Sequence, residues 1–256
     1  MNAPTDPAHA PATAMLLAAG RGSRMRPLTD HCPKPLLPLR GKPLMQWTME
    51  AMAAGGVRRL LVNTGWLGDR IEAQVGPHLS VGGGQAPLDI VYSSEPRGDG
   101  AALETAGGIV RALPQLADVF WLAAGDVHAP GFVFDPAAMA RFAASDRLAH
   151  LWLVPNPPHH PRGDFGIDAA GRATDPAADD AAPRYTYSTI GLYRRALFAA
   201  PYCPLPTGNP DGVAAPLAPL LRAAIADGRV GATLFTGAWT DVGTPERLAE
   251  LERTAG

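Results

Sequence analysis

Lysine is almost absent from this chain of 256 residues: of its 22 basic residues, only Lys34 and Lys42 are lysines. The formal net charge is −2, which excludes the global basic field that attracts nucleic acid or anionic lipid. Any binding of phosphate must therefore depend on a local cluster of charges. We accordingly predict no nucleic-acid partner and no membrane partner.

Cysteine is also scarce, and long apolar runs are missing. Cys32 and Cys203 form no C-x-x-C spacing, which predicts two free thiols in a reducing, cytoplasmic setting. No segment approaches the roughly 20 apolar residues that a membrane span needs. Residues 1–13 lack the basic and apolar regions of a signal peptide, and we expect a disordered tail there.

Short apolar runs alternate with helix-like segments in the first half of the chain. Strands are predicted at 14–18, 58–63, 88–93 and 119–124, and helices at 43–56, 66–75 and 105–111. This order predicts βαβ crossovers and an α/β fold with a Rossmann-like, mostly parallel (mixed) sheet flanked by helices. In such sheets ligands bind beyond the carboxyl ends of the strands.

The pattern changes after residue 145. The later segments predict a strand over 183–195, a helix over 215–228, a strand over 230–235 and a closing helix over 244–253 with Thr244 as its cap. No linker is long enough to separate two domains. We therefore expect a single domain over 14–256, with halves at 14–145 and 146–256, in a monomer or weak homo-oligomer.

The segment LLAAGRGSRMRPLT, residues 16–29, places two glycines and three arginines after the first strand. Met25 stands where a dinucleotide fingerprint needs its third glycine, and no Walker A sequence is present. A glycine-rich turn still offers backbone N–H groups to an anion, and Arg24 and Arg26 can add charge-assisted contacts. Downstream, Lys34 lies between two prolines on a stiff backbone.

Together these motifs resemble the sugar-1-phosphate nucleotidyltransferases, whose signature is an L-A-x-G-x-G-x-R-x-x-P-x-T loop followed by P-K-P. The resemblance implies a GT-A-like fold, an NTP and a sugar 1-phosphate as substrates, and Mg²⁺ as cofactor. It implies that Arg24 holds the triphosphate and that Lys34 neutralises the α-phosphate and the sugar phosphate, with Arg21 and Arg26 as possible helpers. The residues implied to bind nucleotide in this region are Ala18, Ala19, Gly20, Gly22, Ser23, Arg24 and Lys34.

Two aspartates follow strand-like runs: Asp126 in AAGDV and Asp241 in WTDVGTPERL. From the residues alone, Asp126 could equally cap a helix and Asp241 could form a turn. The resemblance assigns both to metal binding and makes Asp126 catalytic beside Arg24 and Lys34. Carboxylates at strand ends suit Mg²⁺, which keeps several of its waters.

The segment LETAGG at 103–108 resembles the L-E-T-G-G-G of N-acetylmuramate-1-phosphate uridylyltransferases. The resemblance implies that Glu104, Gly107 and Gly108 contact the nucleotide. Guanylyltransferases that make GDP-mannose more often carry L-G-T-A-G, so Glu104 favours the uridylyltransferase branch and Ala106 departs from it. Trp66 in NTGWLGD also resembles that branch, although packing in the core explains it equally well.

In the second half, the resemblance implies sugar contacts from Gly163 and from Ser188 in YSTIGLY. Many relatives grip the sugar phosphate with the lysine of an E-K-P segment, which is missing from residues 173–185 here. Arg184 is either its replacement or a solvated strand end. His159 and His160 predict a solvent loop rather than a zinc site.

The sequence therefore predicts an enzyme that makes an NDP-sugar and pyrophosphate. UTP and N-acetylmuramate 1-phosphate are the preferred substrates, in the recycling of cell-wall peptidoglycan sugars. Mannose-1-phosphate guanylyltransferase and glucose-1-phosphate thymidylyltransferase are alternatives of the same reaction class, and the missing lysine argues against the latter. A non-catalytic nucleotide-sugar sensor is the alternative of another class. The presence of both Asp126 and Asp241 argues against it, because a sensor need not keep both metal ligands.

Overall fold

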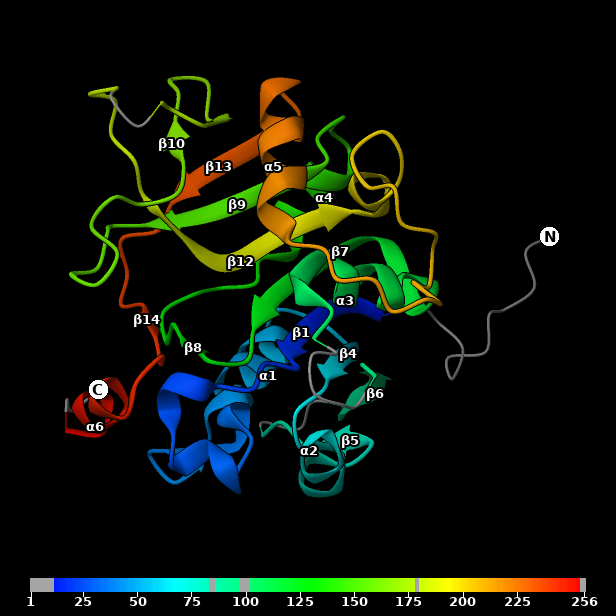
Figure 1. Ribbon diagram of the computed structural model, residues 1–256, viewed down its shortest axis with the longest axis vertical. Helices are drawn as coiled ribbons and strands as arrows, with labels where there is room; N and C mark the ends of the chain where they lie inside the picture. Colours follow the sequence, from blue (N-terminus) through cyan, green and yellow to red (C-terminus); the bar gives the residue numbers. More distant parts are fainter. Residues whose placement is uncertain (1–11, 83–85, 97–101, 178–179, 254–256) are drawn as a thin grey trace.

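The computed structural model describes residues 12–82, 86–96, 102–177 and 180–253. An eight-stranded sheet runs through the molecule and includes strands from both halves of the chain (Figure 1). In order across the sheet, the strands are β13 (Val230–Leu234), β9 (Ala149–Val154), β12 (Thr186–Arg194), β7 (Leu116–Ala124), β1 (Ala12–Ala18), β4 (Arg59–Thr64), β6 (Leu88–Ser94) and β5 (His78–Leu79).

The pairing of these strands confirms the predicted mostly parallel, mixed sheet. β1 is parallel to both β4 and β7, β4 is parallel to β6, and β13 is parallel to β9. β12 is antiparallel to both of its neighbours, and β5 is antiparallel to β6. β1 begins at Ala12, so the tail predicted at 1–13 overlaps the first strand; residues 1–11 lie outside the described part.

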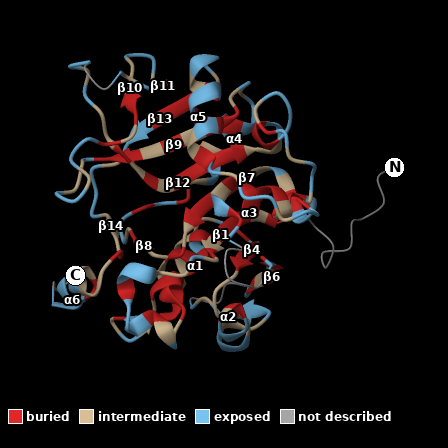
Figure 2. Ribbon diagram, in the orientation of Figure 1, coloured by how far each residue is buried: buried red, intermediate tan, exposed pale blue. Residues whose placement is uncertain are grey.

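Helices cover both faces of the sheet. They are α1 (Leu44–Ala54), α2 (Gly68–Val75), α3 (Glu104–Ala112), α4 (Pro136–Ala143), α5 (Leu217–Ala226) and α6 (Pro245–Arg253). Alternate residues of β1 point to opposite faces: Met15 packs in a cluster with α3 and α5, whereas Leu16 packs in a second cluster with α1 and α4. The strands are accordingly the most buried part of the molecule (Figure 2). Within the described ranges, every helix is too short or too polar to cross a membrane.

The predicted helices are all present, with small differences at their ends. α3 begins at Glu104, so Thr105 lies inside the helix instead of capping it. α6 follows Thr244, whose side-chain oxygen accepts a hydrogen bond from the backbone N–H of Arg247 (3.4 Å), as expected of a cap. α4 was not predicted, although its Asp135 cap followed by Pro136 is a helix-start signal.

Short strand pairs and single helical turns complete the fold. The strand pairs are β2 (Pro38–Leu39) with β3 (Lys42–Pro43), β8 (Val127–His128) with β14 (Thr240–Asp241), and β10 (Gly166–Ile167) with β11 (Ala173–Thr174). After β1, the chain forms the 3₁₀ turns η2 (Ser23–Met25), η3 (Leu28–Asp30) and η4 (Lys34–Leu36). Because β4 and β7 lie on opposite sides of β1, the connections diverge there and leave a crevice at its carboxyl end.

The opening loop, residues 19–36, depends on a glycine at position 22. Gly22 has a positive φ of 63°, a left-handed conformation that L side chains rarely adopt. A Cβ atom there would lie 3.2 Å from the side chains of both Lys34 and Thr29. Thr29 also donates a hydrogen bond from Oγ1 to the Gly22 carbonyl (2.9 Å). The glycine therefore allows the loop to close tightly against Lys34.

Arg21 holds the same loop from outside. Its Nη1 donates to the carbonyl of Thr29 (2.8 Å), and its Nη2 pairs with Asp30 (2.9 Å). Its guanidinium lies 3.7 Å from the ring centroid of Trp66, whose Nε1 also donates to the Thr29 carbonyl (3.0 Å). Arg21 is thus a structural residue, not the phosphate-binding helper the sequence allowed, and Trp66 clamps the opening loop.

We predict that the contact between Arg21 and Trp66 stabilises the fold measurably. In a double-mutant cycle with Arg21→Gln and Trp66→Leu, we expect a coupling free energy of about 0.5–1 kcal/mol, the range for a partly exposed cation–π pair. Urea unfolding followed by circular dichroism measures it. Additive effects of the two substitutions would contradict the prediction.

Candidate active site

A cavity of about 510 Å³ opens at the carboxyl ends of β1, β4 and β7. Nine of the residues predicted to form the site line it: Ala18, Ala19, Gly20, Gly22, Ser23, Arg24, Lys34, Glu104 and Asp126. The remaining lining residues are Leu17, Pro35, Asn63, Glu95, Ala102, Thr105, Ala124, Thr189 and Gly243. The opening loop and the end of β7 therefore meet in one pocket, as the parallel sheet predicts.

The side of the pocket formed by Gly20 and Arg24 offers an accessible backbone and a positive charge to an anion. A Cβ atom added at Gly20 would meet nothing within 4 Å, so the backbone there is accessible from the cavity. Arg24 is exposed at the pocket wall. Among the described residues it has no hydrogen bond or ion pair, in contrast to Arg21 and to Arg26, which pairs with Asp30 (3.2 Å). Arg24 can therefore turn its guanidinium to a phosphate.

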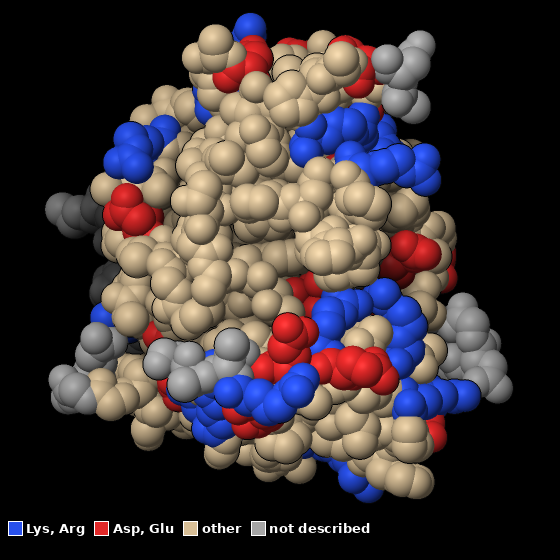
Figure 3. Space-filling model, turned by 90° about the vertical axis from the view of Figure 1, so that its left-hand side faces the viewer, with Lys and Arg blue, Asp and Glu red and all other residues tan. Residues whose placement is uncertain are grey.

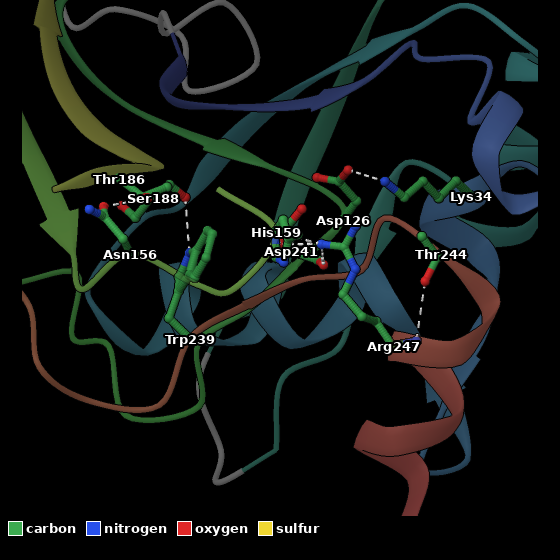
Figure 4. A network of polar contacts seen from close by, with 10 residues as sticks. All are labelled: Lys34, Asp126, Asn156, His159, Thr186, Ser188, Trp239, Asp241, Thr244 and Arg247. Carbon is green, nitrogen blue, oxygen red and sulfur yellow. Dashed lines mark hydrogen bonds and ion pairs between the residues drawn. The ribbon is translucent and has the colours of Figure 1, made fainter. Parts of the chain in front are cut away.

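Lys34 forms an ion pair with Asp126 across the pocket (Figure 4). The lysine side chain is only 11% exposed, and the rigid turn η4 with Pro33 and Pro35 on either side holds its backbone. Asp126 follows β7, far from Lys34 in the sequence. A nearly buried lysine keeps its charge best beside a carboxylate, so each partner holds the other in place.

Asp241 reaches the same place through the β8–β14 pair. It lies opposite Val127 in that pair, and the backbone N–H of Val242 donates to the carbonyl of Asp126 (2.9 Å). Its Oδ1 accepts a hydrogen bond from Nη1 of Arg247 (2.6 Å) and lies 2.9 Å from Nε2 of His159 (Figure 4). The two aspartates predicted to bind metal are thus neighbours in space: Asp241 ends β14, and Asp126 directly precedes the paired strand β8.

The two carboxylates fit a divalent metal ion. Within the described ranges, Asp126 Oδ1 and Asp241 Oδ2 accept no hydrogen bond, whereas Asp126 Oδ2 and Asp241 Oδ1 are held by cations. No group of three or more His, Cys, Asp or Glu side chains in that part of the chain could hold a metal alone. Mg²⁺ is commonly bound by one or two carboxylates together with substrate phosphates and water, which this donor set matches.

His128 lies in β8, opposite Thr240, and is buried. Burial lowers its pKa, and the positive charges of Arg40 and Lys42 lower the pKa further. Neither ring nitrogen has a hydrogen-bond partner among the described residues, and the ring meets Trp47 edge to face at 5.2 Å. His128 therefore supports the β8–β14 pair by packing.

Two polar residues of the pocket wall were missed by the sequence reasoning. Asn63 donates from Nδ2 to Oε1 of Glu95 (3.1 Å), and the other oxygen of this nearly buried carboxylate accepts the backbone N–H of Leu103 (3.0 Å). The Glu95 carboxylate thereby fixes the start of the segment that bears Glu104. Asn63 lies near the carboxyl end of β4, and Glu95 directly follows β6, so the strand-end rule could have found both.

Gly107 and Gly108, predicted to contact nucleotide, are buried in α3 and do not line the pocket. A Cβ atom at Gly107 would lie 2.7 Å from the Val213 carbonyl, and one at Gly108 would lie 2.8 Å from Oε1 of Glu95. The two glycines allow close packing of α3 behind the wall, and their contact with the nucleotide stays a prediction.

The sugar end of the pocket also differs from the prediction. Ser188 is fully buried, and its Oγ donates to the Trp152 carbonyl (2.6 Å) and accepts from the Ile190 N–H (3.1 Å). Its neighbour Thr189 lines the pocket instead, with φ at 64° and a buried Oγ1 that has no partner among the described residues. The register of β12 against β9 shifts between Tyr187 and Gly191, and such a bulge re-aims side chains.

Gly163 does not line the pocket, and close packing explains why a glycine stands at this position. Its φ is 60°, and a Cβ atom would lie 2.6 Å from Oδ1 of Asn156. The same loop holds His159, whose side chain is 38% exposed, as expected for a solvent loop, and whose Nε2 also lies 2.9 Å from Oδ1 of Asp241. Arg184 is also away from the pocket, because it donates from Nη2 to the carbonyl of Asp164 (2.6 Å) and from Nη1 to the carbonyl of Pro176.

Charged side chains of both signs gather on the face that bears β14 and α6. Figure 3 shows them next to one another in the lower half of that face, beside a broad area of uncharged residues.

Comparison with known proteins agrees with this geometry. An N-acetylmuramate alpha-1-phosphate uridylyltransferase of Neisseria meningitidis is 41% identical over 251 residues, which cover 95% of this chain and 98% of that protein. A protein of the same name from Caulobacter vibrioides is 31% identical over 96% of this chain and 98% of its own length.

Solved structures share the fold. A Bacillus anthracis protein in complex with sucrose superposes with a TM-score of 0.74 at 18% identity, covering 95% of this chain and 96% of that one. The inositol-1-phosphate CTP transferase of T. maritima superposes with a TM-score of 0.65 at 18% identity, covering 95% of this chain and 97% of that one. These likenesses confirm the predicted GT-A-like fold. Residues 13–178 match the model of the nucleotidyl transferase family, which confirms the resemblance seen in the opening loop: the chain belongs to the nucleotidyl transferase family.

Proposed function

We propose that this protein transfers the uridylyl group of UTP to N-acetylmuramate 1-phosphate, which yields UDP-N-acetylmuramate and pyrophosphate. The observation that carries the proposal is the Lys34–Asp126 ion pair in one pocket with Arg24, which has no ion pair among the described residues, next to Asp241 of β14. The two full-length relatives named above support the choice of substrates. We infer that the reaction serves recycling of cell-wall sugars in the cytoplasm, which suits two free cysteines.

In the proposed complex, the triphosphate lies along the opening loop. The accessible backbone at Gly20 faces its oxygens, and Arg24 attracts the β- and γ-phosphates, which depart as pyrophosphate. The base lies toward Glu104, whose backbone the Glu95 contact to Leu103 supports. Gly107 and Gly108 allow α3 to pack closely behind this wall.

The transfer joins two anions, so the protein's task is to neutralise charge and align the reactants. An oxygen of the sugar phosphate attacks the α-phosphorus of UTP, a new P–O bond forms, and the bond to the departing pyrophosphate breaks. Lys34, held by Asp126, points its ammonium group into the pocket where negative charge accumulates on the α-phosphate.

Asp126 and Asp241 would hold Mg²⁺ through the oxygens that no described residue occupies. When bound, the ion supplies positive charge that screens the phosphates from one another. At the sugar end, the unsatisfied Thr189 hydroxyl supports a hydrogen bond to the sugar, in the role that the sequence predicted for Ser188.

We predict that Lys34→Ala lowers kcat by about 100-fold or more, as expected when one preorganised charge is removed from the developing charge of a transition state. Lys42→Ala is the matched control, because the other lysine of the chain pairs with Glu50 and lies over the Trp47 ring, outside the pocket wall. We expect Lys42→Ala to change kcat by less than about threefold. Steady-state pyrophosphate release measures both, and near-normal turnover of Lys34→Ala would overturn the mechanism.

The substrate assignment predicts turnover with one nucleotide and one sugar. Pyrophosphate release with Mg²⁺ is measured for UTP, dTTP and GTP against the 1-phosphates of N-acetylmuramate, N-acetylglucosamine, glucose and mannose. We expect the highest kcat/KM for UTP with N-acetylmuramate 1-phosphate. A preference for GTP with mannose 1-phosphate, or for dTTP with glucose 1-phosphate, would replace the substrates and keep the reaction, whereas nucleotide binding without turnover would favour a sensor.

A further inference from the structure

The sugar half of the chain has no lysine with which to neutralise the sugar phosphate, since Lys34 and Lys42 are the only lysines in the sequence. Arg184 cannot take that role, because its guanidinium is bound to the backbone of Asp164 and Pro176, away from the pocket. The resemblance gives Lys34 both the α-phosphate and the sugar phosphate, but its single ammonium group already pairs with Asp126, and Arg24 serves the departing phosphates in the proposed complex. A second anionic substrate therefore gains from a further cation.

Arg247 lies at the edge of the pocket beside the metal-site aspartates. It belongs to the first turn of α6, and Figure 4 shows its side chain extending from that helix toward Asp241 and His159. Gly243 lines the pocket, and a Cβ atom on it would lie only 2.4 Å from Nη2 of Arg247. The missing side chain at Gly243 thus leaves the guanidinium room at the pocket wall.

The hydrogen bonds of Arg247 leave part of its guanidinium unused. Nη1 donates to the Asp241 carbonyl (2.9 Å) and to Asp241 Oδ1 (2.6 Å), which engages both of its hydrogens. Nε2 of His159, 2.9 Å from Nη1, then completes the network as a donor to Oδ1. In the described part of the chain, Nε and Nη2 of Arg247 have no acceptor, although the side chain is only 16% exposed.

We propose that Arg247 binds the phosphate group of the sugar 1-phosphate through these free donors, an inference that rests on the proposed function. Asp241 fixes the guanidinium, so little side-chain freedom is lost when the phosphate binds. A planar guanidinium with two adjacent donors free matches a phosphate in a bidentate manner. Arg247 would thus replace the lysine that relatives carry in an E-K-P segment.

Equilibrium binding tests this role without turnover. Isothermal titration calorimetry measures the Kd of N-acetylmuramate 1-phosphate, and of N-acetylglucosamine 1-phosphate, for the protein saturated with Mg²⁺ and α,β-methylene-UTP. We expect Arg247→Gln to raise both Kd values about tenfold or more, as loss of a charge-assisted contact predicts, while the Kd of the UTP analogue changes less than about threefold. Arg247→Lys, which keeps the charge but not the fork, should fall between Gln and wild type.

Arg222→Gln is the matched control, because it removes the same charge from an exposed position on α5 that pairs with Asp175. It should leave all three Kd values within about twofold of wild type. An equal loss of affinity for the two sugar 1-phosphates in Arg247→Gln supports binding of the phosphate group. A loss of affinity confined to N-acetylmuramate 1-phosphate would overturn the proposal and indicate that Arg247 binds the carboxylate of that sugar instead.

The remaining outcomes also decide the matter. Unchanged Kd values in Arg247→Gln, or an equal loss of affinity for the UTP analogue, would leave Arg247 a support for Asp241 and overturn the proposal. If the wild-type protein turned over no sugar 1-phosphate, the proposed function would fail. The dependence of sugar-phosphate binding on Arg247 would be measured separately, so the two failures remain distinguishable.

Discussion

The ion pair between Lys34 and Asp126 joins two parts of the chain that are 92 positions apart, and the shape of the pocket depends on it. A lysine that is nearly buried needs a carboxylate within reach, and the end of β7 supplies it. The lysine can reach that point only because Gly22 lets the opening loop close against its side chain. Arg21 and Trp66 hold the outer side of the same loop. The glycine signature and the lysine are therefore one structural unit.

Arg247 and Asp241 repeat this arrangement on β14, which pairs with the strand that follows Asp126. Each aspartate has one oxygen on a cation and the other without a partner among the described residues. Cations that neutralise the carboxylates also keep these side chains from repelling an incoming anion. The protein thus carries a balanced set of charges at the site, consistent with a chain whose net charge is close to zero.

The central sheet could be predicted from the sequence because local signals carry it. Buried parallel strands such as β1 and β4 are short apolar runs between turns, and the helices between them have clear ends. The order of the strands across the second half could not be predicted. The antiparallel β12 lies between β7 and β9 because of pairing between distant segments, which leaves no periodicity to read. The β8–β14 pair has only two residues in each strand, too few for any pattern.

The same division explains the site. Arg24, Lys34 and Asp126 lie on a signature loop and a strand end, and the structure brings all three to one pocket. Ser188 and Thr189 are adjacent and chemically alike, so only the bulge in β12 decides which hydroxyl faces the pocket. A β-branched residue at positive φ is strained, and strain of this kind persists where the surrounding structure imposes it. Here the pairing of β12 with both neighbours imposes it, and the result is a buried hydroxyl at the pocket wall with no partner among the described residues.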